Sequence, residues 1–242
     1  MFLYIWNTFF FNPVYNSLIF FVEIVPGGDV GIAIILTTIL IKTVLLPLSI
    51  KAAKTQKIMK EIEPKIKEVK EKYKDKKEEQ ARAMLEIYKE AGMNPFSSLV
   101  VFILQIPLVI ALYLSVYGYA GYVLPEVNTE ALYSFLSAPT QIDMFFLGLV
   151  DMAGKSALLA FLAGVTMFIQ MRLMMPKLPE RDKDASPDFK ADFARNMQMQ
   201  MKYVMPVVIA IAAYTISAAI ALYFVVSNLF AIAQEFYIRR HR

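Results

Sequence analysis

The segment Thr37–Leu48, "TTILIKTVLLPL", places a single lysine, Lys42, inside an otherwise apolar run. An ammonium group removed from water costs free energy unless it is solvated or paired. The run belongs to a longer apolar stretch, Val30–Ile50, in which Lys42 is the only charge. About 20 mainly apolar residues suffice for a helix to cross a bilayer. The sequence therefore predicts a transmembrane helix that carries a cation.

The composition of the whole chain also indicates a membrane protein. Of 242 residues, 57% are hydrophobic, and the mean hydropathy is +0.49, far above that of an ordinary soluble domain. The chain has no cysteine, which excludes disulfides and thiolate chemistry. The only histidine is His241, which disfavours histidine-based metal or hydrolytic sites. We expect no catalytic residues, no metal and no cofactor.

The distribution of charge predicts the orientation in the membrane. Lys51–Glu90 carries 13 basic and 9 acidic residues, Arg172–Lys202 carries 7 basic and 5 acidic residues, and the chain ends in "RRHR". Met1–Asp29 and Gly118–Met152 contain no Lys or Arg. Because short loops rich in Lys and Arg stay in the cytoplasm, the basic segments and the C-terminus are predicted inside. The two segments without Lys or Arg are predicted outside.

The last apolar run, Tyr203–Ile238, has 36 residues and no basic residue. One helix of that length would measure about 54 Å, against a hydrocarbon core of about 30 Å. Two short spans that meet near Thr215–Ala219 fit the bilayer and keep the C-terminus inside.

The fold class is therefore predicted as an all-α integral membrane protein with five transmembrane helices. The predicted order is an N-terminal interfacial segment (1–28), a first span (29–51), a cytoplasmic helical hairpin (52–92), a second span (95–123), an external loop (124–144), a third span (145–175) whose helix begins as early as Phe145, a cytoplasmic loop (176–200), a fourth span (201–216), a fifth span (218–238) and a short basic cytoplasmic tail (239–242).

The N-terminal segment lacks the basic start and the small-residue cleavage site of a signal peptide. Its many aromatic residues favour a helix at the outer membrane interface, interrupted at "NPVYN". A sixth span is the alternative.

In the predicted cytoplasmic hairpin, apolar residues recur at helical spacing from Ile58 to Tyr73 and again from Met84 to Ala91. Asp75, followed three residues later by Glu78, predicts the start of the second helix.

Lys42 lies nine residues before Lys51, or about 13 Å along a helix, whereas a lysine side chain reaches about 6 Å. One interpretation is that Lys42 snorkels into a locally thinned bilayer, and the other is that it faces a water-filled cavity. Thr38 lies one helical turn before Lys42 and Ser49 two turns after it, on the same face of a straight helix.

Other predicted spans carry polar side chains too. Each amide alone predicts a hydrogen bond between helices, but one in nearly every span predicts a shared polar cavity. The predicted spans contain no mid-membrane carboxylate, which disfavours a cation channel or a proton-coupled transporter. Asp151 and Lys155 are predicted to form an i, i+4 ion pair at the outer end of the third span. The polar residues at depth are Gln105, Thr166, Gln170, Tyr223, Ser227, Asn228 and Gln234.

Three segments carry a resemblance to a known family. They are "LTTILIKTVLLPLSIKAAKTQKIMKEIEPKIKEVKEKYK" (36–74), "EIYKEAGMNPFSSLVVFILQIPLVIALY" (86–113) and "MKYVMPVVIAIAAYTISAAIALYFVVSNLFAIAQEFYI" (201–238). The chain resembles the YidC/Oxa/Alb membrane protein insertases of bacterial-type plasma membranes, in the form without a large external domain, from about Asn12 to Ile238. The family often has Pro and Gly in the turn between its last two spans, where this chain has "TISAAI".

The resemblance implies a five-helix core with a hydrophilic groove that is open to the cytoplasm and the lipid and closed toward the outside. In the family a basic residue of the first span, usually Arg, lies in the groove, and Lys42 occupies that position. Lys keeps the charge but lacks the planar fork of Arg. Gln105 lies in the family's "QIP" motif. The expected substrate groove comprises Lys42, Thr38, Gln105, Gln170, Tyr223, Ser227 and Asn228.

The resemblance also implies a function without bond chemistry. An insertase takes hydrophilic parts of nascent membrane proteins into the groove and releases their apolar segments to lipid. The implied partners are nascent membrane proteins and the lipid bilayer, with the Sec translocon, signal recognition machinery and ribosome as further candidates and no specific nucleic acid. A small-solute channel or anion carrier that uses Lys42 is the alternative. A structural assembly factor without a wet groove is the third possibility.

Overall fold

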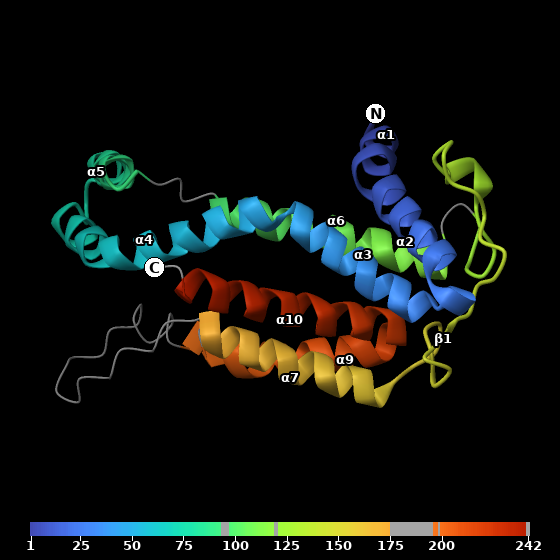
Figure 1. Cartoon of the computed structure of the whole chain (residues 1–242). Coiled ribbons are helices and arrows are strands. Elements are labelled where there is room, and N and C mark those ends of the chain that lie inside the picture. Colours follow the sequence, from blue (N-terminus) through green and yellow to red (C-terminus); the bar gives the residue numbers. More distant parts are fainter. Residues whose placement is uncertain (93–96, 119–120, 175–195, 198, 241–242) are drawn as a thin grey trace. The chain divides into compact units, whose positions relative to one another are not determined.

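The computed structural model describes residues 1–92, 97–118, 121–174, 196–197 and 199–240 (Figure 1). The described chain is mostly helical, with one small two-stranded sheet. It divides into two units, which we describe separately: Met1–Lys42 together with Val109–Arg242, and Thr43–Leu108. Most of the predicted cytoplasmic loop at 176–200 and the last two residues of the predicted tail lie outside the described residues.

The first unit begins with three consecutive helical segments, α1 (Phe2–Trp6), the π-helical η1 (Asn7–Phe11) and α2 (Asn12–Ile24). The predicted interruption at "NPVYN" is wrong, because the helix continues through it. Pro13 has no amide hydrogen to donate, and the wide π turn just before it is a common way to accommodate such a gap. The side chains that α2 buries include Val14, Leu18, Ile19 and Val22, which recur at helical spacing and form one packed face.

A short 3₁₀ turn, η2 (Pro26–Gly28), leads to α3 (Val30–Val44), and α4 (Leu46–Lys72) follows after one residue. The axes of α3 and the start of α4 differ by 60°. Pro47 explains the break, because proline lacks an amide donor and disfavours a helical conformation in the residue before it. Lys42 and Ser49 are predicted to share a face only if one straight helix contains both. The bend lies between the two residues, so this prediction no longer holds.

In the second unit, α4 packs against α5 (Lys77–Glu90) through the buried side chains of Ile62 and Ile66. The Gln80 side chain ties the connection, because its Nε2 donates to the carbonyl oxygen of Lys70 over 3.0 Å. The start of the second helix, predicted at Asp75, lies two residues later, since α5 begins at Lys77 without a side-chain capping bond. The partly buried residues around the two isoleucines are Ile58, Met59, Met84, Ile87, Tyr88 and Ala91.

Helix α6 (Ser97–Tyr117) begins in the second unit and ends in the first. The first unit also contains α7 (Ala157–Met174), η4 (Gln200–Val204), α9 (Met205–Ile216) and α10 (Ala218–Arg240). Figure 1 shows α7, α9 and α10 side by side. Gly164 lies where α7 meets α9, because an added Cβ would lie 3.0 Å from the Ala210 Cβ and 3.1 Å from the Pro206 carbonyl oxygen. Such small residues let membrane helices approach closely.

Two described helices, α7 and α10, are long and apolar enough to cross a membrane, and the bent pair α3–α4 makes a third if it counts as one span. Ile103–Tyr117 and Gln200–Ile216 are shorter apolar helices. The protein is therefore an α-helical membrane protein by the length and composition of its helices.

The break between α9 and α10 falls at Ser217, within the stretch where two short spans were predicted to meet. Ser217 has an extended backbone, and its hydroxyl oxygen accepts a hydrogen bond from the Ile220 amide over 3.2 Å. This is the capping arrangement that serine favours at a helix start. The Ala218 amide donates to the Gly154 carbonyl over 2.8 Å, and the Ala219 amide donates to the Met152 carbonyl over 3.1 Å. The first turn of α10 is thus fixed to the segment before α7.

The segment between α6 and α7 contains a 3₁₀ turn, η3 (Thr129–Ala131), and the antiparallel strands β1 (Phe145–Phe146) and β2 (Val150–Asp151). A helix beginning near Phe145 is therefore wrong, and α7 begins at Ala157. The predicted ion pair of Asp151 and Lys155 is also wrong, because these residues precede the helix. The Asp151 carboxylate accepts from the Ala153 amide over 2.9 Å, and the Lys155 ammonium lies 5.8 Å from the ring centroid of Tyr214.

Candidate functional site

Lys42 lies in the last turn of α3 and is half-buried. It follows Val30 by twelve residues, or about 18 Å along the helix. Just over one turn earlier the helix buries two hydroxyl groups, those of Thr37 and Thr38. The Thr38 hydroxyl donates to the Ile34 carbonyl over 2.7 Å. Among the described residues, the Thr37 hydroxyl has no hydrogen-bond partner, and such buried groups usually bind a water or a polar ligand.

A second polar group joins α7 to α10. The Asn228 amide nitrogen donates to the Ala163 carbonyl over 3.2 Å and to the Thr166 hydroxyl oxygen over 3.1 Å. The Thr166 hydroxyl in turn donates to the Leu162 carbonyl over 2.8 Å. Both Asn228 and Thr166 are buried. These bonds are of the kind that holds membrane helices together, so Asn228 ties the two helices.

Replacing Asn228 with Leu is expected to lower the free energy of unfolding by about 1 kcal/mol, because both hydrogen bonds between the helices are lost. Thermal unfolding in detergent measures the change. Gln170→Leu is the matched control, since the Gln170 amide donates only a 3.6 Å bond to the Met174 sulfur of its own helix. An equal loss in both variants would contradict the role of Asn228 as the tie.

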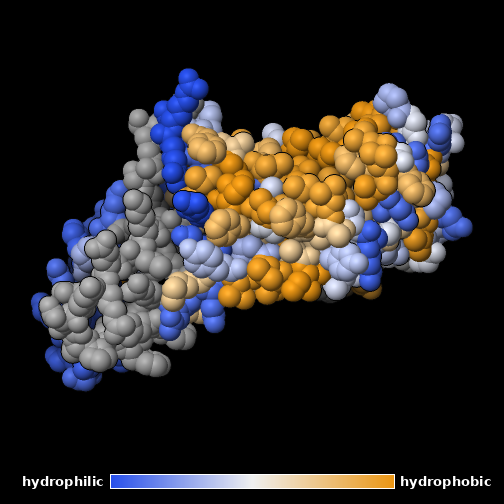
Figure 2. Space-filling view, turned by 90° about the horizontal axis from the view of Figure 1, so that it is seen from below, coloured by the Kyte–Doolittle hydropathy of each residue, from blue (hydrophilic) through white to orange (hydrophobic). Residues whose placement is uncertain are grey.

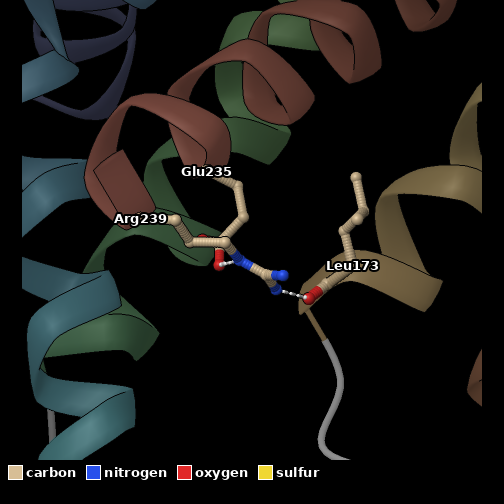
Figure 3. Close-up of polar contacts among 3 residues, drawn as sticks. All are labelled: Leu173, Glu235 and Arg239. Carbon is tan, nitrogen blue, oxygen red and sulfur yellow. Dashed lines mark hydrogen bonds and ion pairs between the residues drawn. The ribbon is translucent and has the colours of Figure 1, made fainter. Parts of the chain in front are cut away.

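A third polar group lies at the ends of the same helices (Figure 3). The Arg239 Nε donates to the Glu235 carboxylate over 2.7 Å, one turn earlier on α10. The same guanidinium donates to the carbonyl oxygen of Leu173 in the last turn of α7, where helix carbonyls lack a partner within their own helix. Arg239 was predicted only as part of a basic tail. In the sequence, only the i, i+4 spacing from Glu235 pointed to its ion pair.

The other predicted groove residues lie on three elements. Tyr223 and Ser227 are buried one turn apart on α10, and Gln170 is half-buried on α7. Gln105 lies on α6 in the second unit. Within the first unit, the structure brings Asn228 together with Thr166. Within the described part of the chain there is no group of three or more His, Cys, Asp or Glu residues that could hold a metal ion.

Asp29, just before α3, is a buried carboxylate that no sequence motif indicates. Its Oδ1 accepts from the Ile32 amide over 2.9 Å, and its Oδ2 accepts from the Leu147 amide over 2.7 Å. Main-chain bonds on both sides reinforce this junction, from the Val30 amide to the Asp143 carbonyl and from the Asp143 amide to the Gly28 carbonyl, each 2.9 Å long. The start of α3 is therefore fixed to the loop that precedes β1.

The same loop region also holds α2. The Asn16 side chain donates to the Ala131 carbonyl over 2.9 Å and accepts from the Tyr133 amide over 2.6 Å. The Tyr15 hydroxyl oxygen accepts from the Asn128 amide over 2.8 Å. At the end of α6, the Tyr117 hydroxyl donates to the Ala153 carbonyl. Residues 121–156, which we call the closing segment, thus bind α2, α3, α6 and α10 at one end of the first unit.

Two apolar helices are long enough to cross a bilayer and are joined by hydrogen bonds, and the bent apolar pair α3–α4 carries a lysine. These features define a polytopic helical membrane protein. Within this class, the chain belongs to the 60Kd inner membrane protein family, whose sequence model matches residues 20–242. This confirms the resemblance to the YidC/Oxa/Alb insertases, a family of membrane insertases and not of enzymes.

Curated relatives match over nearly the whole chain. The membrane protein insertase YidC of Oceanobacillus iheyensis is 33% identical over 241 residues, which cover 98% of this chain and 84% of the relative. The membrane protein insertase MisCA of Bacillus subtilis is 32% identical, over 97% of this chain and 79% of the relative. The membrane protein insertase YidC 2 of Bacillus anthracis is 30% identical, over 97% and 81%.

Proposed function

We propose that this protein is an insertase that takes hydrophilic parts of nascent membrane proteins into a polar groove and releases their apolar segments to lipid. The observation that carries the proposal is Lys42, a cation in the apolar helix α3 of a chain whose relatives are named membrane protein insertases. The implied partners are nascent membrane proteins and the lipid bilayer.

The proposed topology has five spans, an interfacial N-terminal segment outside and the C-terminus in the cytoplasm. The charge distribution supports it, because the basic α4–α5 pair and the end of α10 would lie inside. If Asp29 lies at the outer interface, Lys42 lies about 18 Å along a helix that enters a core of about 30 Å. This depth exceeds the reach of a snorkelling side chain from the outer side.

The proposed mechanism lowers the cost of bringing polar atoms into the bilayer. A substrate with an acidic extracellular tail enters the groove from the cytoplasm, and the Lys42 ammonium attracts the tail carboxylates. Water and hydroxyl groups, among them the buried Thr37 and Thr38 of α3, replace part of the bulk hydration of the tail. The free energy of a polar group at mid-membrane depth then falls. The apolar part of the substrate partitions into lipid, and this step drives release.

The proposed groove is closed toward the outside, and the closing segment supports this. Its main-chain bonds to the first turns of α3 and α10, together with the fully buried Met152, leave these helix ends packed. A channel needs a path across the whole membrane, whereas an insertase needs access only from the cytoplasm and the lipid. The packed end therefore favours the insertase over the alternative of a small-solute channel or anion carrier.

A crosslinking experiment tests the proposal. A photoreactive residue at position 42 is expected to crosslink to a nascent single-span substrate during its insertion. Position 161 is the control, since Phe161 on α7 is 66% exposed and faces lipid in the proposed topology. Equal crosslinking from both positions would remove the special role of position 42.

Two further measurements separate the rival functions. Steady conductance of the purified protein in a planar bilayer would support the channel. A cysteine at position 42 that resists water-soluble thiol reagents would support an assembly factor without a wet groove.

The charged α4–α5 pair is the proposed receiving surface for a ribosome, signal recognition machinery or the Sec translocon. Its basic residues would hold it near anionic lipid at the membrane surface.

A further inference from the structure

The turn that joins β1 to β2 exposes three apolar side chains at alternate positions. Phe145 is 51% exposed, Leu147 61% and Leu149 81%. Their neighbour Phe146 points the other way, because its ring occupies the space that a Cβ on Gly31 would need, 2.4 Å away. The hairpin is thus fixed to α3 on one side and presents an apolar edge on the other.

Leu147 adopts an unusual backbone conformation for this exposure. Its φ is +51°, a left-handed value that glycine or asparagine adopts at less cost than leucine. The Asp29 carboxylate holds this turn by accepting from the Leu147 amide. Burial within the chain offsets little of this cost, because most of the Leu147 side chain packs against no other part of the unit. An apolar environment outside the chain would offset the cost.

The surface next to the hairpin indicates which environment this is. The helix that follows, α7, exposes Leu158 and Phe161 in its first turns, and a spanning helix presents such side chains to lipid. Figure 2 shows the apolar side chains of α7 and α9 gathered into a continuous surface. The stretch Gly118–Met152, which contains the hairpin, has no Lys or Arg, so the exposed edge itself carries no basic residue.

We propose that the tip of this hairpin, Phe145, Leu147 and Leu149, inserts into the boundary between headgroups and acyl chains of the lipid bilayer. Aromatic and leucine side chains favour this boundary. The lipid surface is the occupant, because only residues 152–156 separate the hairpin from α7, whose exposed side chains face lipid in the proposed topology. Since Asp29 joins the hairpin to the start of α3, the lipid contact also fixes the depth of α3. The inference depends on the membrane location of the chain and not on insertase activity.

Tryptophan fluorescence in proteoliposomes tests the proposal without any substrate. The single native tryptophan, Trp6, is replaced by phenylalanine, and one tryptophan is then introduced at a time. Leu149→Trp reports on the hairpin tip. Phe161→Trp on α7 is the lipid-facing reference, and Glu130→Trp on the exposed η3 turn is the aqueous reference. Lipids brominated near the headgroup quench the fluorescence of a tryptophan in the membrane, and acrylamide quenches that of a tryptophan in water.

The expected result is that Leu149→Trp emits at shorter wavelength than Glu130→Trp and is quenched by brominated lipid as strongly as Phe161→Trp. Emission and acrylamide quenching equal to those of Glu130→Trp would overturn the proposal. So would protection from both quenchers, which would place a protein partner or a second copy on the hairpin. Phe145→Trp repeats the measurement at a second tip position, so that poor folding of one variant leaves the test intact.

Discussion

Replacing Lys42 with glutamate is expected to abolish insertion of a single-span substrate with an acidic extracellular tail. Two like charges about 5 Å apart at an effective dielectric constant of about 20 repel by about 3 kcal/mol, which slows a step by roughly two orders of magnitude. Lys42→Arg should retain activity because it keeps the charge, and Lys42→Ala should be intermediate because hydration of the groove remains. Protease protection of the tail in proteoliposomes measures insertion.

A reversed substrate supplies the control for this prediction. A tail in which lysines replace the acidic residues should insert poorly with the wild-type protein and better with Lys42→Glu. A substrate with a neutral tail should respond little to either charge. If Lys42→Glu inserts the acidic tail as well as the wild type does, the electrostatic role of Lys42 is wrong and only its hydration matters.

Gly28→Ala is expected to prevent assembly of the first unit. A Cβ at Gly28 would lie 2.2 Å from the carbonyl oxygen of Gln141 and 2.8 Å from its carbonyl carbon. Neither main-chain atom moves without disturbing the adjacent hydrogen bonds of Asp143 to Gly28 and to Val30. We expect a loss above about 4 kcal/mol, the range of severe single substitutions. Thermal unfolding in detergent and resistance to proteolysis measure it.

Gly27→Ala is the matched control for that substitution. Both glycines have positive φ, +79° at Gly27 and +67° at Gly28, but nothing lies within 4 Å of a Cβ at Gly27. The control therefore carries only the left-handed backbone cost of roughly 1–2 kcal/mol. Similar unfolding temperatures for the two variants would mean that the loop at Gln141 yields easily, against the fixed junction described for α3.

The helical membrane class could be predicted from the sequence because it follows from the length of apolar runs and the positions of basic residues. Both are visible without knowledge of how the helices pack. Helices α7 and α10 follow directly from such runs. The bend at Leu45 and the hairpin at 145–151 were missed for different reasons. Pro47 stands in an apolar run whose length alone suggested one span. The stretch "FFLGL" is apolar, and that composition fits a helix as well as a strand. Its conformation depends on the hydrogen bond to Asp29 and the packing on Gly31, which the sequence does not show.

The candidate site was predicted in part. Lys42 could be found because a charge in an apolar run is conspicuous at any depth. The pairing of Asn228 with Thr166 could not be found, because partners on different helices depend on packing and not on spacing. Asp29 could not be found either. In the sequence it is one acidic residue before a helix, and its second hydrogen bond, to the Leu147 amide, joins residues more than a hundred positions apart.

The joint between α9 and α10 makes few demands on its residues. Its bonds to the closing segment run from the main-chain amides of Ala218 and Ala219 to main-chain carbonyls, and every residue except proline carries that donor. Both positions are fully packed, so substitution there requires only a small side chain that is not proline. A joint of this kind can drift in sequence while its geometry persists. The "TISAAI" of this chain meets both demands, because alanine is small and keeps its amide donor.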